Sequence, residues 1–377
     1  MNPVLIPLSR PDLDDSDREA VARVLDGDVL SLGEESDLFE AEFVEFLGEP
    51  RHAATVSSGT AGLYLALRAL GVDGGTVLTP SYGFVGTAHA IELAGAKPRF
   101  VEVDPQTLVV DVETLEAAWT PEVTAIIPVH LFGTPPPMAA ICEWAASKNI
   151  PVIEDSCEAI GGLSGGRACG TAGDVSVFAF YPNKQMTTGE GGMVVARDPE
   201  VAATIRSLRN QGRGPGEFEF TSVGFNFRLT EMQCALGRSQ LRRLPTFIAL
   251  RQALAEEYAQ DLSEVSGISL LRPTPPGDRR SWFVFPVLVD DPADRPRLRE
   301  ALAEVGAQTA LYFRAIHTMT PYADSALRGV NLDQTESIAQ RSFAIPFFNR
   351  LPSEDRRIVV DTISRTLAGR PASSLTA

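Results

Sequence analysis

The stretch 177–195, VFAFYPNKQMTTGEGGMVV, places one lysine between a strand-like aromatic run and a glycine-rich turn. Lys184 is unusual because only three of the 33 basic residues are lysines, the other two being Lys97 and Lys148. A lysine amine can lose its proton when it is desolvated and can then attack an aldehyde, whereas a guanidinium effectively never does. Lys184 is therefore either an ordinary surface cation or a residue whose chemistry arginine cannot perform.

On both sides of this stretch, short apolar runs alternate with amphipathic segments between about residues 50 and 210. The expected strands are 52–56, 76–80, 97–103, 124–130, 151–155, 174–180 and 192–196. Between the first two lies a helix-like segment in which Leu63, Leu67 and Leu70 share a face and Gly71 supplies the stop. This alternation predicts an α/β fold with a mixed, mostly parallel sheet sandwiched by helices.

A change of pattern after Gly224 indicates a second structural unit. Thr230 and Gln233 have the spacing of a capping box, and Pro245 punctuates the long helical region that follows. From about residue 246 the order becomes helix, strand (282–289), helix, which predicts a smaller α+β domain. We expect an N-terminal segment (1–20) that packs with the small domain, a large domain (21–245) and a small C-terminal domain (246–377).

Composition argues against several classes of protein. The formal net charge of −16, with no basic stretch to override it, argues against nucleic acid as a partner. The amino terminus lacks the features of a signal peptide, and no apolar run reaches the roughly 18 residues of a membrane helix, so we expect a cytoplasmic protein. The four cysteines form no CxxC pair and the four histidines are scattered, which predicts no metal site.

Residues that follow strands are the first candidates for a site, because ligands collect at the carboxyl ends of strands in α/β sheets. Residues 57–60, SSGT, can hold an anion on free amides at a helix start, although a plain N-cap is the simpler explanation of them alone. The aromatic residues Tyr82 and Phe84 can stack on a flat ring or belong to the core. Asp155 can pair with a cationic ring nitrogen or cap the following loop.

Taken together with Lys184, these features are the components of a pyridoxal-phosphate site. Two other kinds of site lack their motifs in this sequence. The P-loop motif GxxxxGK[ST] is absent, and no GxGxxG turn of a nicotinamide-dinucleotide site follows a strand. The order of the features along the chain is also the expected one.

The chain resembles the DegT/StrS family of pyridoxal-phosphate-dependent sugar aminotransferases, which have the aspartate-aminotransferase-like fold (fold type I). The resemblance covers nearly the whole length and rests on motifs such as SSGTAGLYLAL, IEDSCEAIGG, FYPNKQMTTGEGG and GFNFRLTEMQCALGRSQL. It implies a homodimer with shared sites and these roles: Lys184 as Schiff-base lysine and proton carrier, Asp155 as partner of the pyridine nitrogen, Phe84 on the ring, Gly59 and Thr60 on the phosphate, and Asn226 reaching that phosphate from the partner subunit.

Two positions depart from the family pattern. Ala179 stands where a phosphate-binding serine is usual, and Tyr181 and Asn183 are the possible substitutes. Glu158 stands where a glutamine often contacts the phenolic oxygen of the cofactor, so we expect its pKa to be raised.

The substrate side of the resemblance rests on fewer residues. Four residues lie in regions that line the family's sugar-nucleotide cleft, and for each of them a surface or structural role is equally open: Arg213, Arg228, Tyr312 and His317.

The resemblance implies an aminotransferase that takes nitrogen from an amino acid, with glutamate as the expected donor. Pyridoxamine phosphate is then the intermediate form of the cofactor. The nitrogen then passes to a keto group of a nucleotide-linked deoxysugar. A cyclitol ketone is an alternative substrate, and a cofactor-binding regulator or non-catalytic partner subunit is an alternative function. Elimination is a third possibility. Relatives that act as dehydratases have histidine in place of the lysine, so Lys184 argues against that activity.

Overall fold

The computed structural model describes residues 6–324 and 327–369; residues 1–5, 325–326 and 370–377 of the expected first and last units lie outside the described residues. The elements before the long helix are, in chain order, α1 (Asp15–Leu25), α2 (Glu34–Leu47), β1 (His52–Val56), α3 (Gly59–Ala69), β2 (Thr76–Pro80), α4 (Gly86–Ala94), β3 (Lys97–Val101), α5 (Val112–Ala118), β4 (Val123–Ile126), the 3-10 turn η1 (Leu131–Gly133), α6 (Met138–Lys148), β5 (Ile153–Asp155), β6 (Leu163–Ser164), β7 (Arg167–Ala168), β8 (Val175–Ala179), β9 (Gly192–Ala196) and α7 (Pro199–Leu208). Each of the seven expected strands is present, and some are shorter than expected.

The large sheet is mixed and mostly parallel, as the sequence predicts. Its four-stranded part has the order β1-β9-β8-β5 and its three-stranded part the order β3-β2-β4. Parallel bridges between Ile126 and Val152 and between Val129 and Asp155 connect the two parts. The pairs β5–β8, β2–β3 and β2–β4 are parallel, whereas β9 runs antiparallel to β1 and β8. The carboxyl ends of β1, β2, β5 and β8 therefore lie along one edge.

Both faces of this sheet are buried, because side chains alternate between them along each strand. In β8, Val175 and Val177 pack in a cluster with α3, α4 and α7, whereas Phe178 packs in another cluster with α2 and α8. Phe39 and Phe43 of α2 contact Phe180 just beyond the strand. The sheet is thus held between two helical layers, and residues just beyond its edge are positioned from both sides.

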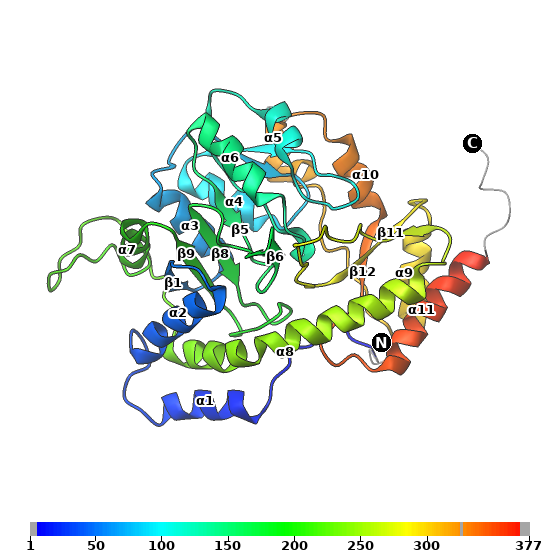
Figure 1. The fold of residues 1–377 in the computed structure, drawn as a ribbon, viewed down its shortest axis with the longest axis horizontal. Helices are drawn as coiled ribbons and strands as arrows, with labels where there is room; N and C mark the ends of the chain where they lie inside the picture. Colours follow the sequence, from blue (N-terminus) through cyan, green and yellow to red (C-terminus); the bar gives the residue numbers. More distant parts are fainter. Residues whose placement is uncertain (1–5, 325–326, 370–377) are drawn as a thin grey trace.

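The long helix α8 (Glu231–Leu262) runs from the large sheet to a second, smaller sheet (Figure 1). Thr230 caps it as predicted, since its side chain accepts from the Gln233 amide while the Gln233 side chain accepts from the Thr230 amide. Pro245 lies inside the helix and does not end it. The remaining elements are β10 (Ile268–Ser269), β11 (Phe285–Val289), α9 (Asp294–Glu304), η2 (Ile316–Thr318), η3 (Thr320–Tyr322), α10 (Asp333–Arg341), β12 (Ser342–Ile345) and α11 (Ser353–Ala368). Strands β10, β11 and β12 form an antiparallel sheet in that order.

The two halves of α8 belong to different hydrophobic cores. Leu241 and Leu244 pack with α2 and the large sheet, whereas Tyr258 and Leu262 pack with β11, β12, α9 and α11. The boundary expected at residue 245 therefore falls within one continuous helix. At the other end of the chain, Ile6 bridges to Ala307. The division into three units stays a prediction.

Within residues 6–324 and 327–369, no helix combines the length and the apolar character needed to cross a membrane. In the same ranges no group of three or more histidine, cysteine, aspartate or glutamate side chains is arranged to hold a metal ion. The four cysteines are free thiols.

Candidate active site

A cavity of about 590 Å³ lies at the carboxyl edge of the large sheet. Its volume is typical of cofactor and substrate sites. The residues with predicted roles that line it are Gly59, Thr60, Phe84, Asp155, Glu158, Lys184 and Tyr312, and the predicted substitutes Tyr181 and Asn183 line it together with Ala179. The fold therefore brings together residues from the ends of four strands and from the segment after α9.

Lys184 follows β8 in a tight turn, in which its amide donates to the carbonyl of Tyr181 at 2.9 Å. Its side chain is only 13% exposed, and its Nζ lies 3.3 Å from Oε1 of Glu158. The same Nζ stands 3.9 Å from the centroid of the Phe283 ring. The amine thus has one face against an aromatic ring and a carboxyl group beside it, and it is largely shielded from water.

Asp155 ends β5 and is buried, with its carboxylate in the cavity. Oδ2 accepts a hydrogen bond from the Thr87 hydroxyl at 2.7 Å, and Oδ1 accepts from the Cys157 amide at 3.2 Å. Glu154 serves a different purpose, because its carboxylate accepts from backbone amides of the 170–173 loop and contacts His130. Strand alternation therefore places Asp155 in the cavity and Glu154 in a structural network.

Glu158 is held beside Lys184 by an unusual piece of backbone. Its Oε2 accepts from the Phe132 amide at 2.7 Å, and Phe132 has a left-handed backbone with φ of 52°. Burial raises the pKa of Glu158, while the Lys184 ammonium and the Phe132 amide oppose that shift. The direction agrees with our expectation, but in this structure the leading cause is burial.

The start of α3 leaves backbone amides free beside the cavity. Ser58 caps the helix by accepting from the Ala61 amide at 3.1 Å, and no acidic residue occupies the first turn. Within the described chain no hydrogen bond engages the amides of Gly59 and Thr60, which lie at the positive end of the helix dipole. A Cβ on Gly59 would come within 2.7 Å of the Cys157 Sγ, so glycine keeps this approach open.

Ala179 presents only a methyl group to the cavity, close to Gly59. Of its two possible substitutes, Tyr181 is half-exposed, whereas Asn183 donates from Nδ2 to the Tyr312 hydroxyl at 3.3 Å. Oδ1 of Asn183 is buried and has no partner among the described residues. An unsatisfied polar atom at this position favours a polar ligand in the cavity.

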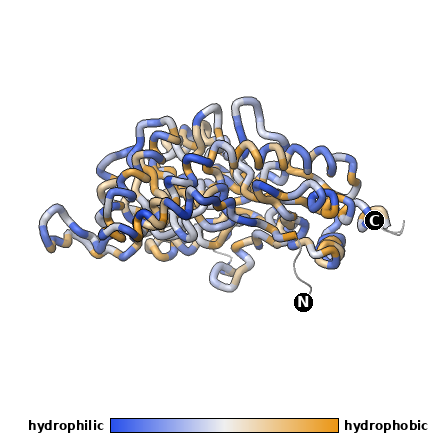
Figure 2. The backbone as a smooth tube through the Cα atoms, turned by 90° about the horizontal axis from the view of Figure 1, so that it is seen from below, coloured by the Kyte–Doolittle hydropathy of each residue, from blue (hydrophilic) through white to orange (hydrophobic). Residues whose placement is uncertain are grey.

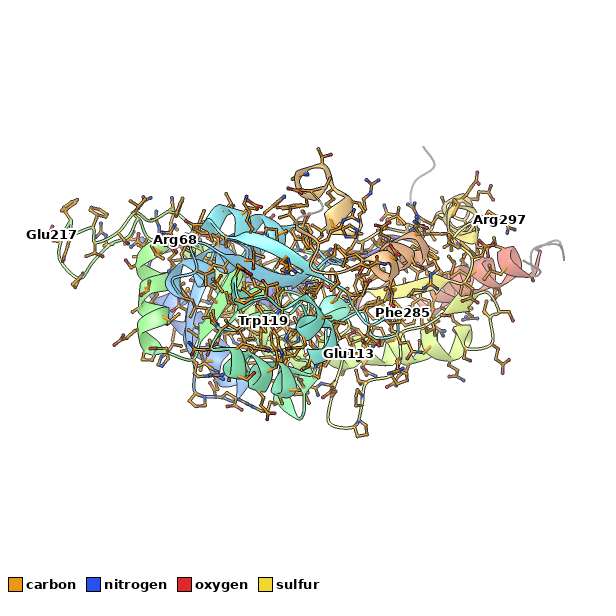
Figure 3. All side chains as sticks on the ribbon, turned by 90° about the horizontal axis from the view of Figure 1, so that it is seen from above. Arg68, Glu113, Trp119, Glu217, Phe285 and Arg297 are labelled. Atoms are coloured by element: carbon orange, nitrogen blue, oxygen red, sulfur yellow. The ribbon has the colours of Figure 1, made fainter. Side chains whose placement is uncertain are left out.

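Three of the predicted residues lie on or beside an arm that projects from the large unit. This arm, residues 210–228, follows α7 and extends away from the rest of the protein in Figures 1 and 2, with Glu217 near its tip in Figure 3. Arg213 and Asn226 are exposed, and Arg228 donates to the side chain of Asn210 at 2.9 Å. None of the three is among the residues that line the cavity in the described chain.

His317 is also absent from the cavity lining. It is fully buried, with Nδ1 2.6 Å from the Ser81 hydroxyl and Nε2 2.9 Å from a carboxylate oxygen of Glu336. These contacts tie the segment after α9 to the turn after β2. By contrast, Tyr312 of the same segment reaches the cavity, where burial raises its pKa to about 12.

Two residues of the site have no recognisable signal in the sequence. Thr87, the partner of Asp155, lies in the first turn of α4 and looks like any small helical residue. Phe283, the ring beneath the Lys184 amine, belongs to an apolar run that precedes β11. Only tertiary packing, in a cluster with Val129 and Phe132, brings Phe283 to the lysine.

The residues present fit pyridoxal phosphate. The open amides at α3 match a phosphate, the buried Asp155 carboxylate matches a cationic pyridine nitrogen, and the shielded Lys184 amine matches an aldehyde. Together with the mixed sheet, this arrangement is the one expected of a pyridoxal-phosphate-dependent enzyme of fold type I.

Comparison with known proteins places the chain within that class. Residues 11–364 match the DegT/DnrJ/EryC1/StrS aminotransferase family. A relative in Caulobacter vibrioides, GDP-perosamine synthase, is 36% identical over 330 residues, which are 85% of this chain and 88% of that protein.

Two solved structures have the same fold over almost their entire length. The aminotransferase TlmJ from Streptoalloteichus hindustanus has a TM-score of 0.92 at 33% identity, covering 97% of this chain and 99% of that one. DesV from S. venezuelae, solved in complex with a ketimine intermediate, has a TM-score of 0.91 at 34% identity, covering 98% and 100%. The chain belongs to the DegT/DnrJ/EryC1/StrS aminotransferase family.

Proposed function

We propose that this aminotransferase uses pyridoxal phosphate to move an amino group from glutamate to a keto group of a nucleotide-linked deoxysugar. The observation that carries the proposal is the convergence of the Lys184 amine, the Asp155 carboxylate and the open start of α3 in one cavity. Bound pyridoxal phosphate supplies an aldehyde that condenses with amines and a ring that takes up electrons from the adjacent carbon.

In this proposal the chain's own groups hold and orient that cofactor. The amides of Gly59 and Thr60 bind the phosphate, and the Phe84 ring, which is 60% exposed at the cavity, covers one face of the pyridine ring. Asp155 keeps the ring nitrogen protonated. Thr87 holds the Asp155 carboxylate in place by its 2.7 Å hydrogen bond.

Lys184 would anchor the cofactor and, once released by an incoming amine, would carry a proton between the nitrogen-bearing carbon of the substrate and the aldehyde carbon of the cofactor. A desolvated amine suits this task because it can be neutral at one step and cationic at the next. Glu158, 3.3 Å from Nζ, would accept a hydrogen bond from the ammonium form. With its raised pKa, Glu158 can also keep a proton and donate to the phenolic oxygen, which an ionised carboxylate would repel.

The relatives support the proposed substrate class. GDP-perosamine synthase is named for a GDP-linked product, and it is 36% identical to this chain. A nucleotide-linked sugar carries phosphates, yet in the described chain the only basic residue lining the cavity is Lys184. Additional cations therefore have to come from outside this cavity, and the arm carries candidates for them.

We further propose that the active protein is a homodimer in which the arm of each subunit completes the site of the other. The arm exposes four large apolar side chains, Phe218, Phe220, Val223 and Phe225, which are unusual on a free surface. It also carries Arg213, and Arg228 lies at its base. In the dimer Asn226 would reach the phosphate, while the two arginines would face the anionic groups of donor and acceptor.

Isotope transfer tests this function directly. The purified protein is loaded with pyridoxal phosphate and incubated with [¹⁵N]glutamate and a panel of nucleotide-linked keto-sugars and keto-cyclitols, and the products are weighed by mass spectrometry. We expect ¹⁵N in a sugar product and a glutamate-dependent shift of the visible absorbance. Label in a cyclitol would change the substrate class, ammonia release would indicate elimination, and bound cofactor without transfer to any acceptor would favour a regulator.

Replacing Lys184 by arginine is the matching residue test. Lys184→Arg keeps a cation beside Glu158 but removes the amine that condenses with an aldehyde. We expect the variant to fold and to lose transamination, measured by the same label transfer. Transfer at the wild-type rate would remove Lys184 from its proposed role.

A further inference from the structure

Arg251, in α8, is a buried cation that forms no ion pair with any acid in the described part of the chain. Its side chain is almost fully enclosed, and burial lowers the pKa of the guanidinium to about 10. A charge withdrawn from water in this way destabilises the protein unless polar groups satisfy it. The identity of those groups therefore indicates what the residue does.

The hydrogen bonds of Arg251 go from its two Nη atoms to carbonyl oxygens of two backbone segments, and its buried Nε has no partner in the described chain. Nη1 donates to Phe283 at 3.0 Å and to Trp282 at 3.3 Å, and Nη2 makes a longer contact, 3.5 Å, with the carbonyl of Lys184. One rigid, planar guanidinium thus joins the turn that carries the lysine to the segment that carries the ring beneath its amine.

The neighbouring residue braces the same junction. Nε2 of Gln185 donates to the carbonyl oxygens of Glu158 and Ser281, at 2.6 and 3.0 Å, and lies 2.8 Å from the Ser281 hydroxyl oxygen. The lysine turn is therefore fastened to residues 281–283 twice, by Gln185 from within the turn and by Arg251 from α8.

We propose that Arg251 is a positioning residue for Lys184, fixing the lysine turn against the Phe283 segment so that the amine stands over the ring and beside Glu158. The inference rests on the proposed function of Lys184 and adds a residue that touches neither cofactor nor substrate. Geometry of this kind matters, because a displacement of about 1 Å at a reacting group can cost roughly 100-fold in rate.

The test needs a control that separates positioning from simple stabilisation, and Arg280 provides it. Arg280 is also buried, and burial also lowers its pKa to about 10. Its guanidinium packs on the Trp282 ring, as that of Arg251 packs on the Phe347 ring, at 4.5 and 5.6 Å from the ring centroids. Its hydrogen bonds go to the Thr134 hydroxyl and the Arg272 carbonyl, both at 2.9 Å, and none goes to the lysine turn. The variants are Arg251→Met, Arg251→Lys and Arg280→Met.

Two ligands are compared on each full-length protein after removal of bound cofactor. Pyridoxamine phosphate has no aldehyde and cannot bond covalently to Lys184. Its dissociation constant therefore measures how well the cavity binds the cofactor apart from attachment to the lysine. Pyridoxal phosphate becomes attached when the Lys184 nitrogen bonds to the aldehyde carbon and the aldehyde oxygen leaves as water. Absorbance follows the rate of attachment, and borohydride reduction with peptide mass analysis confirms that it occurs at Lys184.

For Arg251→Met we expect at least a tenfold slower attachment, with the dissociation constant of pyridoxamine phosphate within about twofold of wild type. Arg251→Lys should recover part of the rate, and Arg280→Met should change neither quantity. If Arg251→Met does not fold, the comparison is made between Arg251→Lys and wild type, where a slowed rate is again required.

Attachment by the Arg251 variants at the wild-type rate would overturn the inference while leaving the proposed function intact. Equal slowing in Arg280→Met would also overturn it, because the effect would then reflect stability in general. Failure of the wild-type protein to bind either ligand would instead overturn the proposed function, and the inference with it.

Discussion

The strongest prediction for stability concerns Glu40, a buried acid of α2 that ties three elements together. Its Oε1 accepts from the Thr55 amide at 2.8 Å and from Nη1 of Arg209 at 2.6 Å, while its Oε2 accepts from Nε and Nη2 of Arg206 at 3.2 and 3.1 Å. Arg209 is also buried and ends α7. Thr55 lies in β1, three residues before Ser58, the cap of α3.

Glu40→Gln removes the charge and turns an amide NH₂ toward at least one guanidinium. Breaking a buried ion pair from one side costs about 3–5 kcal/mol, because the remaining charge stays buried without compensation. The matched control is Glu49→Gln, since Glu49 forms an exposed pair with Arg167, whose side chain is 52% exposed. Pairs of that kind contribute about 0–1 kcal/mol.

Urea unfolding at neutral pH, followed by circular dichroism, measures both variants. We expect the Glu40 variant to lose several times more unfolding free energy than the Glu49 variant, at an unchanged dependence on urea concentration. A loss below about 1 kcal/mol, or one equal to that of the control, would refute the view that Glu40 holds a buried charge network.

Three further predictions concern the site itself. Glu158→Gln removes a carboxyl whose pKa is higher in the folded than in the unfolded protein, so wild type loses stability as pH rises through that interval. The variant lacks this loss. In cofactor-free protein, the unfolding free energy of the variant minus that of wild type should therefore increase with pH. Parallel pH profiles of the two unfolding free energies would contradict this. Gly133→Ala should destabilise by about 2 kcal/mol or more, since Gly133 has φ of 75° and a Cβ there would overlap the Ser281 carbonyl. Gly48→Ala is the control, because Gly48 has φ of 68° but a Cβ there would meet no neighbouring atom. Thermal unfolding measures both variants, and an equal loss of stability in the two would argue against the overlap at Gly133. Asp155→Asn should still bind pyridoxamine phosphate but slow label transfer by about 100-fold or more, and unchanged turnover would remove Asp155 from its role.

Much of the fold could be predicted because its signals are local. The apolar runs of the large sheet are separated by turn residues and amphipathic segments, and the capping box at Thr230 fixes the start of α8. Pro245 shows the limit of local signals. A proline is expected to disrupt a helix, yet residues packed on both sides of it, Leu244 and Phe247, belong to one core and keep α8 continuous.

Parts of the candidate site were also predictable. Asp155 and Lys184 follow apolar strands, and residues at the carboxyl ends of parallel strands meet at one edge. His317 illustrates the opposite case, because its position in the sequence suggests a substrate contact while Ser81 and Glu336 hold it in the interior. Whether a polar residue near a site faces the cavity or the core depends on contacts with distant segments.

The sequence by itself determined the α/β class, the strand order along the chain and the one lysine whose amine can do what the abundant arginines cannot. Those features depend on side-chain chemistry and on periodicities within a few residues. The tertiary structure decided the surroundings of that amine, including the Phe283 ring, the Glu158 carboxyl and the Arg251 guanidinium. Burial and distance between remote segments set these properties, and neither quantity exists until those segments pack together in the folded chain.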